Sequence, residues 1–114
     1  MIILVGGEKG GSGKSCLAQN LAVYLQAKKR DILLLDADPQ GTTTDWIKER
    51  DDNNKVESIP SVQAAGNIRQ ILLDLSKRYQ DIILDAGGQD SEALRSAMTI
   101  ATHMLLPFRP KRRD

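Results

Sequence analysis

Short, uniformly apolar runs alternate along the chain with longer stretches in which apolar residues recur every three to four positions. The apolar runs are Ile2–Val5, Ile32–Leu35, Ile82–Leu84 and Met104–Leu106. Runs of this length without polar interruption are typical of strands that are covered on both faces. A weaker candidate, Val56–Ile59, is closed by Pro60 and predicts an edge strand.

The stretches between these runs predict four helices, at about 13–29, 42–50, 67–78 and 91–102. In the first helix, Leu17, Leu21 and Leu25 recur four residues apart and form one apolar stripe. Asn67 is the expected N-cap of the third helix. Strands that alternate with helices through short connections predict an α/β fold, a parallel sheet with flanking helices and right-handed crossovers.

Composition and charge narrow the class of protein without identifying it. At 114 residues, with 40% hydrophobic and 27% charged residues, the chain fits a single small globular domain. A net charge of +1 argues neither for nor against an anionic partner. The single cysteine excludes an intramolecular disulfide. No leader-like segment and no apolar run of membrane-spanning length is visible, so we expect a cytoplasmic protein without a membrane partner.

A glycine-rich segment, Gly6–Ser15, follows the first strand and leads into the first helix. Strand, glycine-rich turn and helix form the context of a phosphate-binding loop, in which converging backbone N–H groups and the helix N-terminus bind phosphate oxygens. We expect Lys14 to reach the β- and γ-phosphates and the Ser15 hydroxyl to bind Mg²⁺. Glu8 replaces the first glycine of the strict motif, and Lys9 is a second lysine inside the loop. The predicted nucleotide-binding residues are Gly10, Gly11, Ser12, Gly13, Lys14, Ser15 and Cys16.

Carboxylates end two of the other predicted strands. Asp85 follows an apolar strand and precedes glycines, a pattern that indicates a Mg²⁺-binding aspartate, with Gly87 allowing a backbone N–H to approach the γ-phosphate. The alternative is an aspartate that merely caps the next turn. Asp36 and Asp38 precede Pro39 and a turn, where aspartates are common for local reasons, so their role in positioning water or acting as a base depends on the phosphate loop.

Three segments in this order resemble the ParA/MinD family of deviant Walker ATPases. They are Lys9-Gly10-Gly11-Ser12-Gly13-Lys14-Ser15, Asp36-Ala37-Asp38-Pro39-Gln40 and Ile82-Ile83-Leu84-Asp85. The turn at Pro39-Gln40-Gly41 is most similar to the ParA branch, the plasmid and chromosome partition ATPases, in the short form without an N-terminal DNA-binding extension.

The resemblance implies roles for individual residues. Lys9, Lys14 and Asp38 would be catalytic: Lys9 would reach phosphates held by the other subunit of a dimer, Lys14 would be the Walker lysine, and Asp38 would position the attacking water. Ser15, Asp36 and Asp85 would form the metal site. The cofactors would be ATP and Mg²⁺, and hydrolysis would run a dimerisation switch.

The same resemblance implies partners. They would be a second copy of the chain, non-specific DNA and a centromere-binding protein of the ParB class, with the protein associated with the nucleoid. Two other interpretations remain open: a MinD-like membrane-cycling ATPase, which would need an amphipathic C-terminal helix, and a nucleotide-binding fragment without turnover.

Two departures from the family pattern affect these expectations. Cys16 replaces a common threonine, and we interpret it as a small packing residue rather than an activated thiol. The family domain normally continues past the strand at Met104–Leu106, so we expect residues 1–110 to be the N-terminal part of an ATPase domain with an incomplete C-terminal half. Residues 111–114 would be a basic tail, solvated or a remnant of a DNA-contacting surface.

Overall fold

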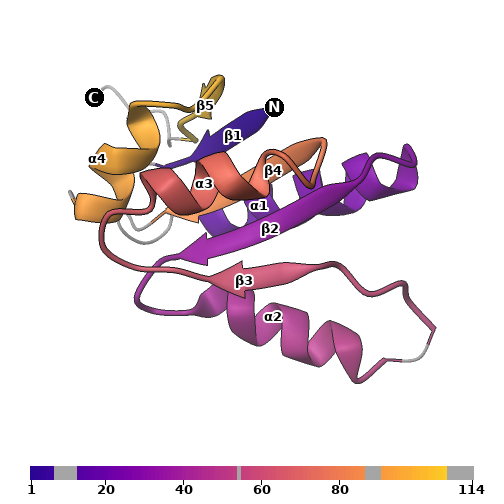
Figure 1. The fold of residues 1–114 in the computed structure, drawn as a ribbon. Helices are drawn as coiled ribbons and strands as arrows, with labels where there is room; N and C mark the ends of the chain where they lie inside the picture. The colour runs from indigo at the N-terminus through magenta and orange to yellow at the C-terminus, as the bar shows by residue number, and fades with distance from the viewer. Residues whose placement is uncertain (7–12, 54, 87–90, 108–114) are drawn as a thin grey trace, which may run out of the picture.

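The computed structural model describes residues 1–6, 13–53, 55–86 and 91–107, which form alternating strands and helices (Figure 1). The elements are β1 (Ile2–Val5), α1 (Lys14–Ala27), β2 (Ile32–Ala37), α2 (Thr42–Asp51), β3 (Ser61–Gln63), α3 (Arg69–Leu75), β4 (Asp81–Ala86), α4 (Glu92–Met98) and β5 (His103–Leu105). The strands form one sheet in the order β3-β2-β4-β1-β5, and every neighbouring pair is parallel. The predicted α/β fold is confirmed.

Helices cover both faces of this sheet. Helices α3 and α4 lie on one face, where Ile68, Leu72 and Ala97 pack against alternate residues of β1, β2 and β4 (Figure 1). Helix α1, with Ile47 of α2, packs against the other face. Strands β2 and β4 are buried along their whole length, because they occupy the interior of the sheet and are covered on both sides.

The third strand lies after Pro60 and not before it, so the prediction of a strand at Val56–Ile59 is wrong. Pairing with β2 begins where the Pro60 carbonyl accepts a hydrogen bond from Leu34 N–H, and it continues along β3. Proline can begin such a ladder because it keeps its carbonyl acceptor. Of residues 56–59, Ile59 alone is buried, and it serves as a core side chain.

Helices α3 and α4 are shorter than predicted. Helix α3 begins at Arg69 with Ile68 as its N-cap, so the expected N-cap at Asn67 is wrong, although the Asn67 side-chain oxygen accepts from Arg69 N–H. Helix α4 is capped by the Ser91 hydroxyl, which accepts from Leu94 N–H, and it ends at Met98. The Met98 side chain, at the end of this helix, is 51% exposed.

The basic end of α1 is anchored to the core and not simply solvated. The Arg30 guanidinium, just beyond the helix, donates two hydrogen bonds to Asp81, whose side chain is fully buried at the start of β4. These bonds hold the pKa of the Asp81 carboxyl below its usual range, against the opposing effect of burial. Arg30 therefore neutralises a core carboxylate.

Candidate functional site

Lys14 lies at the centre of a cluster of carboxylates. It is the first residue of α1, directly after Gly13, whose φ of 77° is the left-handed conformation that glycine allows. Its side chain is buried, and Nζ lies 2.5 Å from Asp85 Oδ1 and 3.0 Å from Asp38 Oδ2. Helix α1 thus directs a lysine toward the carboxyl ends of β2 and β4, the end of an open α/β sheet where ligands bind.

The charges in this cluster are mutually stabilised. Burial by itself lowers the pKa of Lys14, but the hydrogen bonds and charges of Asp85 and Asp38 outweigh it, so the pKa lies above the ordinary value. For Asp38, burial raises the pKa, whereas the Gln40 N–H and the Lys14 ammonium lower it by more. The cluster therefore holds the Lys14 ammonium beside an ionised Asp38 carboxylate near neutral pH.

Asp36 organises the turn that carries Asp38. In the sheet it lies directly beside Asp85, since the two residues are register partners on β2 and β4. Its Oδ1 accepts from Asp38 N–H at 3.0 Å, while its Oδ2 accepts from the backbone N–H and the hydroxyl of Thr44 at 2.8 and 2.6 Å. Both oxygens are thus engaged in fixing the path from β2 into α2.

Two further residues of the cluster were not predicted from the sequence. The Thr43 hydroxyl donates to Asp85 Oδ2 at 2.5 Å, and Gln19 Nε2 donates to the Thr43 hydroxyl at 3.1 Å. Thr43 is 1% exposed. The one signal in the sequence was the position of Thr43 in the first turn of the helix after the acidic turn. Gln19, in the middle of α1, gave no signal, because its role depends on how α1 packs against α2.

The structure brings together four of the predicted site residues, Lys14, Asp36, Asp38 and Asp85. Ser15 follows Lys14 in the first turn of α1 and is partly exposed. Cys16 is exposed, and its Sγ accepts a hydrogen bond from Asn20 at 3.1 Å, so the expected packing role is wrong. The other predicted residues lie outside the described part of the chain: Lys9, Gly10, Gly11, Ser12, Gly87 and the basic tail.

The donor set fits Mg²⁺ bound together with a phosphate. Within residues 1–6, 13–53, 55–86 and 91–107, no group of three His, Cys, Asp or Glu side chains is arranged to hold a metal ion by itself. Mg²⁺ commonly uses one or two carboxylates, with waters and substrate phosphates completing its six oxygen ligands. Asp85 Oδ1, once Lys14 turns from it to a phosphate, and the Ser15 hydroxyl would hold the ion, and Asp36, already committed to the turn, would support the site indirectly.

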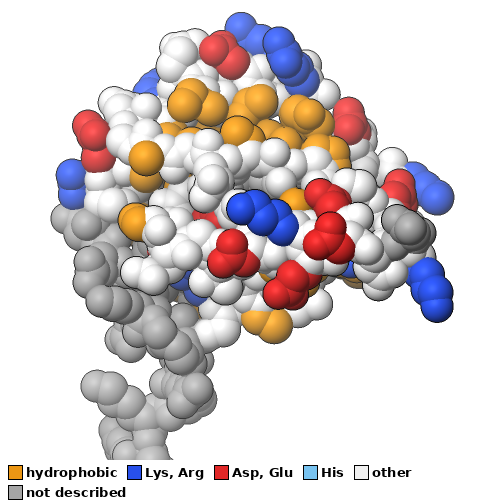
Figure 2. Space-filling view, turned by 90° about the horizontal axis from the view of Figure 1, so that it is seen from below, with side chains coloured by type: hydrophobic (Ala, Val, Ile, Leu, Met, Phe, Trp, Pro, Cys, Tyr) orange, Lys and Arg blue, Asp and Glu red, His pale blue; other side chains and the backbone are white. Residues whose placement is uncertain are grey.

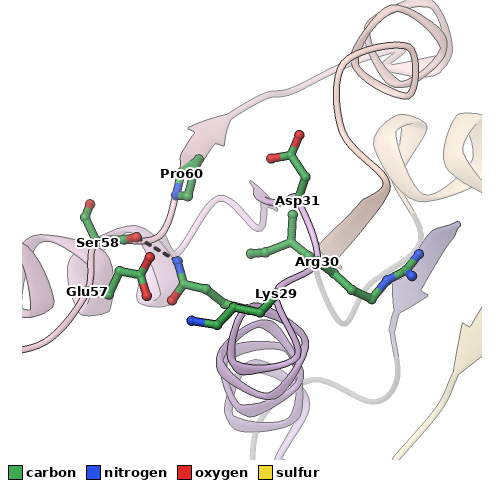
Figure 3. Close-up of a pocket in the computed structure, with 8 residues that line it drawn as sticks. Lys29, Arg30, Asp31, Glu57, Ser58 and Pro60 are labelled. Atoms are coloured by element: carbon green, nitrogen blue, oxygen red, sulfur yellow. Dashed lines mark hydrogen bonds between the residues drawn. The ribbon is translucent and has the colours of Figure 1, made fainter.

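A pocket of about 410 Å³ lies at the opposite end of β2 (Figure 3). Its lining side chains carry both signs of charge: Lys29 and Glu57 lie close together, while Arg30 points away from them toward its partner Asp81. The Gln26 side chain crosses the pocket wall and donates to the Ser58 carbonyl at 2.8 Å. The pocket contains none of the predicted site residues, and its mixed charge selects no class of ligand.

On the face shown in Figure 2, several acidic side chains gather around a basic one beside a band of hydrophobic side chains, and the described residues form no continuous basic area on this face. In the described part of the chain, no helix is both long and apolar enough to cross a membrane.

Comparisons with known proteins agree with this geometry. Residues 3–108 match the model of the CobQ/CobB/MinD/ParA nucleotide binding domain. Protein ParA of Rhizobium radiobacter is 27% identical over 118 residues, which cover 99% of this chain and 50% of that protein. Maintenance of carboxysome distribution protein A of Gloeobacter kilaueensis is 32% identical over 113 residues, which cover 96% of this chain and 49% of that protein. The chain thus spans about half the length of these relatives.

A solved structure has the same fold. The plasmid partition protein of Borrelia burgdorferi superimposes with a TM-score of 0.67 at 21% identity, over 92% of this chain and 63% of that one.

Proposed function

Since the chain belongs to the CobQ/CobB/MinD/ParA nucleotide-binding family, we propose that it is the nucleotide-binding part of a ParA-type partition ATPase that uses ATP and Mg²⁺. The observation that carries this proposal is the buried Lys14 ammonium, held between Asp38 and Asp85 at the carboxyl ends of the strands. A buried lysine at a helix N-terminus, after a glycine-rich segment, is suited to bind phosphate oxygens.

Each residue of the cluster would have a different role in phosphoryl transfer. Lys14 would bind the β- and γ-phosphates, and Mg²⁺, which neutralises developing phosphate charge when bound, would be held by Ser15 and Asp85. Asp38, released from Lys14, would orient the attacking water. Gly10, Gly11, Ser12, Gly13, Cys16 and Gly87 would contribute backbone around the phosphates.

The proposed cycle is a dimerisation switch in DNA segregation. Two chains would sandwich the nucleotides, Lys9 of one reaching the phosphates held by the other, and the dimer would hold non-specific DNA until a ParB-class protein stimulates hydrolysis. The similarity to ParA and to a plasmid partition protein supports this proposal. The carboxysome relative indicates that related chains serve other cargo.

The first experiment tests nucleotide binding. We expect Lys14→Gln to weaken binding of a fluorescent ATP analogue by at least about tenfold, because it removes the charge that pairs with phosphate while keeping a donor for Asp85. Lys55→Ala, at an exposed position between α2 and β3, should bind as the wild type does. Thermal unfolding of both variants checks the fold. Equal affinity for Lys14→Gln and the wild type would contradict the proposal.

The second experiment tests the cycle. The chain is sedimented with plasmid DNA or with liposomes, with and without ATP and Mg²⁺, while phosphate release is followed. DNA pelleting with turnover supports the partition cycle, liposome pelleting supports the MinD-like interpretation, and nucleotide binding with neither supports a chain without turnover. Lys9→Ala should bind nucleotide normally and lose stimulated hydrolysis. Unchanged stimulated turnover in that variant would remove the role proposed for Lys9 across the dimer.

A further inference from the structure

The Asp85 carboxylate is held by a different partner at each oxygen. Its Oδ1 accepts from Lys14 and its Oδ2 accepts from the Thr43 hydroxyl, both at 2.5 Å, and the side chain is fully buried. Lys14 belongs to α1 and Thr43 belongs to α2. The orientation of this carboxylate therefore depends on both helices.

The direction of the Thr43 hydroxyl proton follows from its other partner. Gln19 Nε2 is an amide nitrogen, which can donate a hydrogen bond but cannot accept one. The Thr43 oxygen must therefore accept from Gln19. The hydroxyl proton is then free to point to Asp85 Oδ2. Gln19, Thr43, Asp85, Lys14 and Asp38 form one continuous chain of hydrogen bonds across α1, α2, the end of β4 and the acidic turn.

We propose that Thr43 is a positioning residue of the nucleotide site: by holding Oδ2, it fixes the Asp85 rotamer so that Oδ1 stays directed at the space beside Lys14. This inference rests on the proposed function, in which Asp85 is a ligand of Mg²⁺. With Oδ2 fixed by a neutral donor, Oδ1, which now accepts from Lys14, becomes available to the metal when Lys14 turns to a phosphate. Without the Thr43 hydrogen bond, the Asp85 side chain would lose its fixed rotamer and would have to be oriented anew each time the metal binds.

The same contact gives α2 a link to the site. The turn before α2 carries Asp38, and Asp36 binds Thr44 next to Thr43. The first turn of α2 thus bonds to the carboxylates of two neighbouring strands, Asp36 on β2 and Asp85 on β4. A merely structural role for Thr43 would need its shape but not its hydroxyl, and this difference can be tested.

Three substitutions distinguish the effect of the shape of the Thr43 side chain from the effect of its hydrogen bond to Asp85. Thr43→Val keeps the branched shape and removes the hydroxyl, while Thr43→Ser keeps the hydroxyl and removes the methyl group. Thr42→Val makes the same change at the exposed neighbouring residue. Binding of a fluorescent ATP analogue is measured as Mg²⁺ is titrated, and also in the presence of EDTA.

We expect Thr43→Val to raise the Mg²⁺ concentration for half-maximal binding by about tenfold, as expected for the loss of a hydrogen bond to a charged group. Its affinity for the analogue in EDTA should match the wild type, and Thr43→Ser and Thr42→Val should stay within about twofold throughout. An unchanged Mg²⁺ requirement in Thr43→Val would overturn the inference, as would equal impairment in Thr43→Ser.

A second readout needs no nucleotide. In the ¹⁵N-lysine-labelled chain, the Lys14 ammonium signal is assigned by its loss in Lys14→Gln. We expect the signal to be protected from exchange in the wild type, Thr43→Ser and Thr42→Val, and to broaden or vanish in Thr43→Val, since Asp85 then loses its fixed orientation. An unchanged signal in Thr43→Val would overturn the inference. A wild type that binds no nucleotide would instead overturn the proposed function, and the ammonium signal would still decide the role of Thr43.

Discussion

Strand β4 carries a fully buried aspartate at each end, and each is neutralised by a basic residue from one end of α1. Lys14, the first residue of the helix, pairs with Asp85, and Arg30, just past its last turn, pairs with Asp81. The two pairs differ in exposure, because the Lys14 side chain is buried whereas the Arg30 side chain is 38% exposed. In the proposed function the buried lysine would exchange its carboxylates for phosphate, whereas the Arg30 pair stabilises the fold.

Asp81→Asn should lower stability in a pH-dependent way. Because the folded-state pKa of Asp81 lies below its usual value, the charged pair stabilises the fold above the unfolded pKa of about 3.9, and this contribution is lost as pH falls through the folded pKa. Urea unfolding should therefore show a deficit for Asp81→Asn at pH 7 that shrinks below about pH 4. Asp52→Asn, at an exposed position, is the control. A deficit independent of pH would show that the charge of Asp81 is not its source.

The sequence predicted those site residues whose type and local context both indicate chemistry. Lys14 after a glycine-rich segment and Asp85 after an apolar strand are of this kind, and the structure places them in contact. Thr43 and Asp81 could not be predicted in this way, because a threonine in a first helical turn and an aspartate before an apolar run are common. Their roles appear only when separate elements pack together.

At the scale of elements, the predictions failed in the segments that connect the strands and helices. Strand β3 was misplaced because Val56 and Ile59 before a proline suggested an edge strand, although Ile59 alone of the two enters the core. The strands that are buried on both faces were predicted to within two residues at each end, since their apolar composition follows from that burial.

The end of α1 contains a strained residue. Lys29 has a φ of 65°, and the bonds from Lys29 N–H to the Gln26 carbonyl and from Arg30 N–H to the Leu25 carbonyl form a Schellman motif, in which this position usually holds glycine. The conformation is maintained because Arg30, the next residue, is fixed by Asp81.

Lys29→Gly should stabilise the fold by about 0.5–1 kcal/mol, since glycine adopts a positive φ without steric cost and loses part of that gain to chain entropy. Lys28→Gly is the matched control: Lys28 has a φ of −82°, so the change should be neutral or destabilising. Chemical unfolding of the three chains at one pH gives the comparison. If both glycine variants shift stability in the same direction, the backbone strain at Lys29 is not the cause.

At the scale of the whole molecule, the two edges of the sheet differ. Strand β3 lies beside α2, whereas β5, at the other edge, carries exposed apolar side chains along its length and just after it. Met104 is 39% exposed and Leu106 is 56% exposed. Strand β5 is only three residues long, which limits edge-to-edge pairing, but no lysine, proline or acidic residue interrupts it.

The 114-residue chain prepared alone should therefore self-associate through β5 in a concentration-dependent way. We expect Met104→Lys to shift the onset of association to roughly tenfold higher concentration, because a charged side chain on an edge strand resists pairing while its stem still covers the apolar surface. Val56→Lys adds the same charge to an exposed apolar position away from the sheet edge and should leave association unchanged. Analytical ultracentrifugation of the three chains, with thermal unfolding to confirm folding, measures the effect. If Val56→Lys suppresses association as strongly as Met104→Lys, net charge and not the β5 edge controls it.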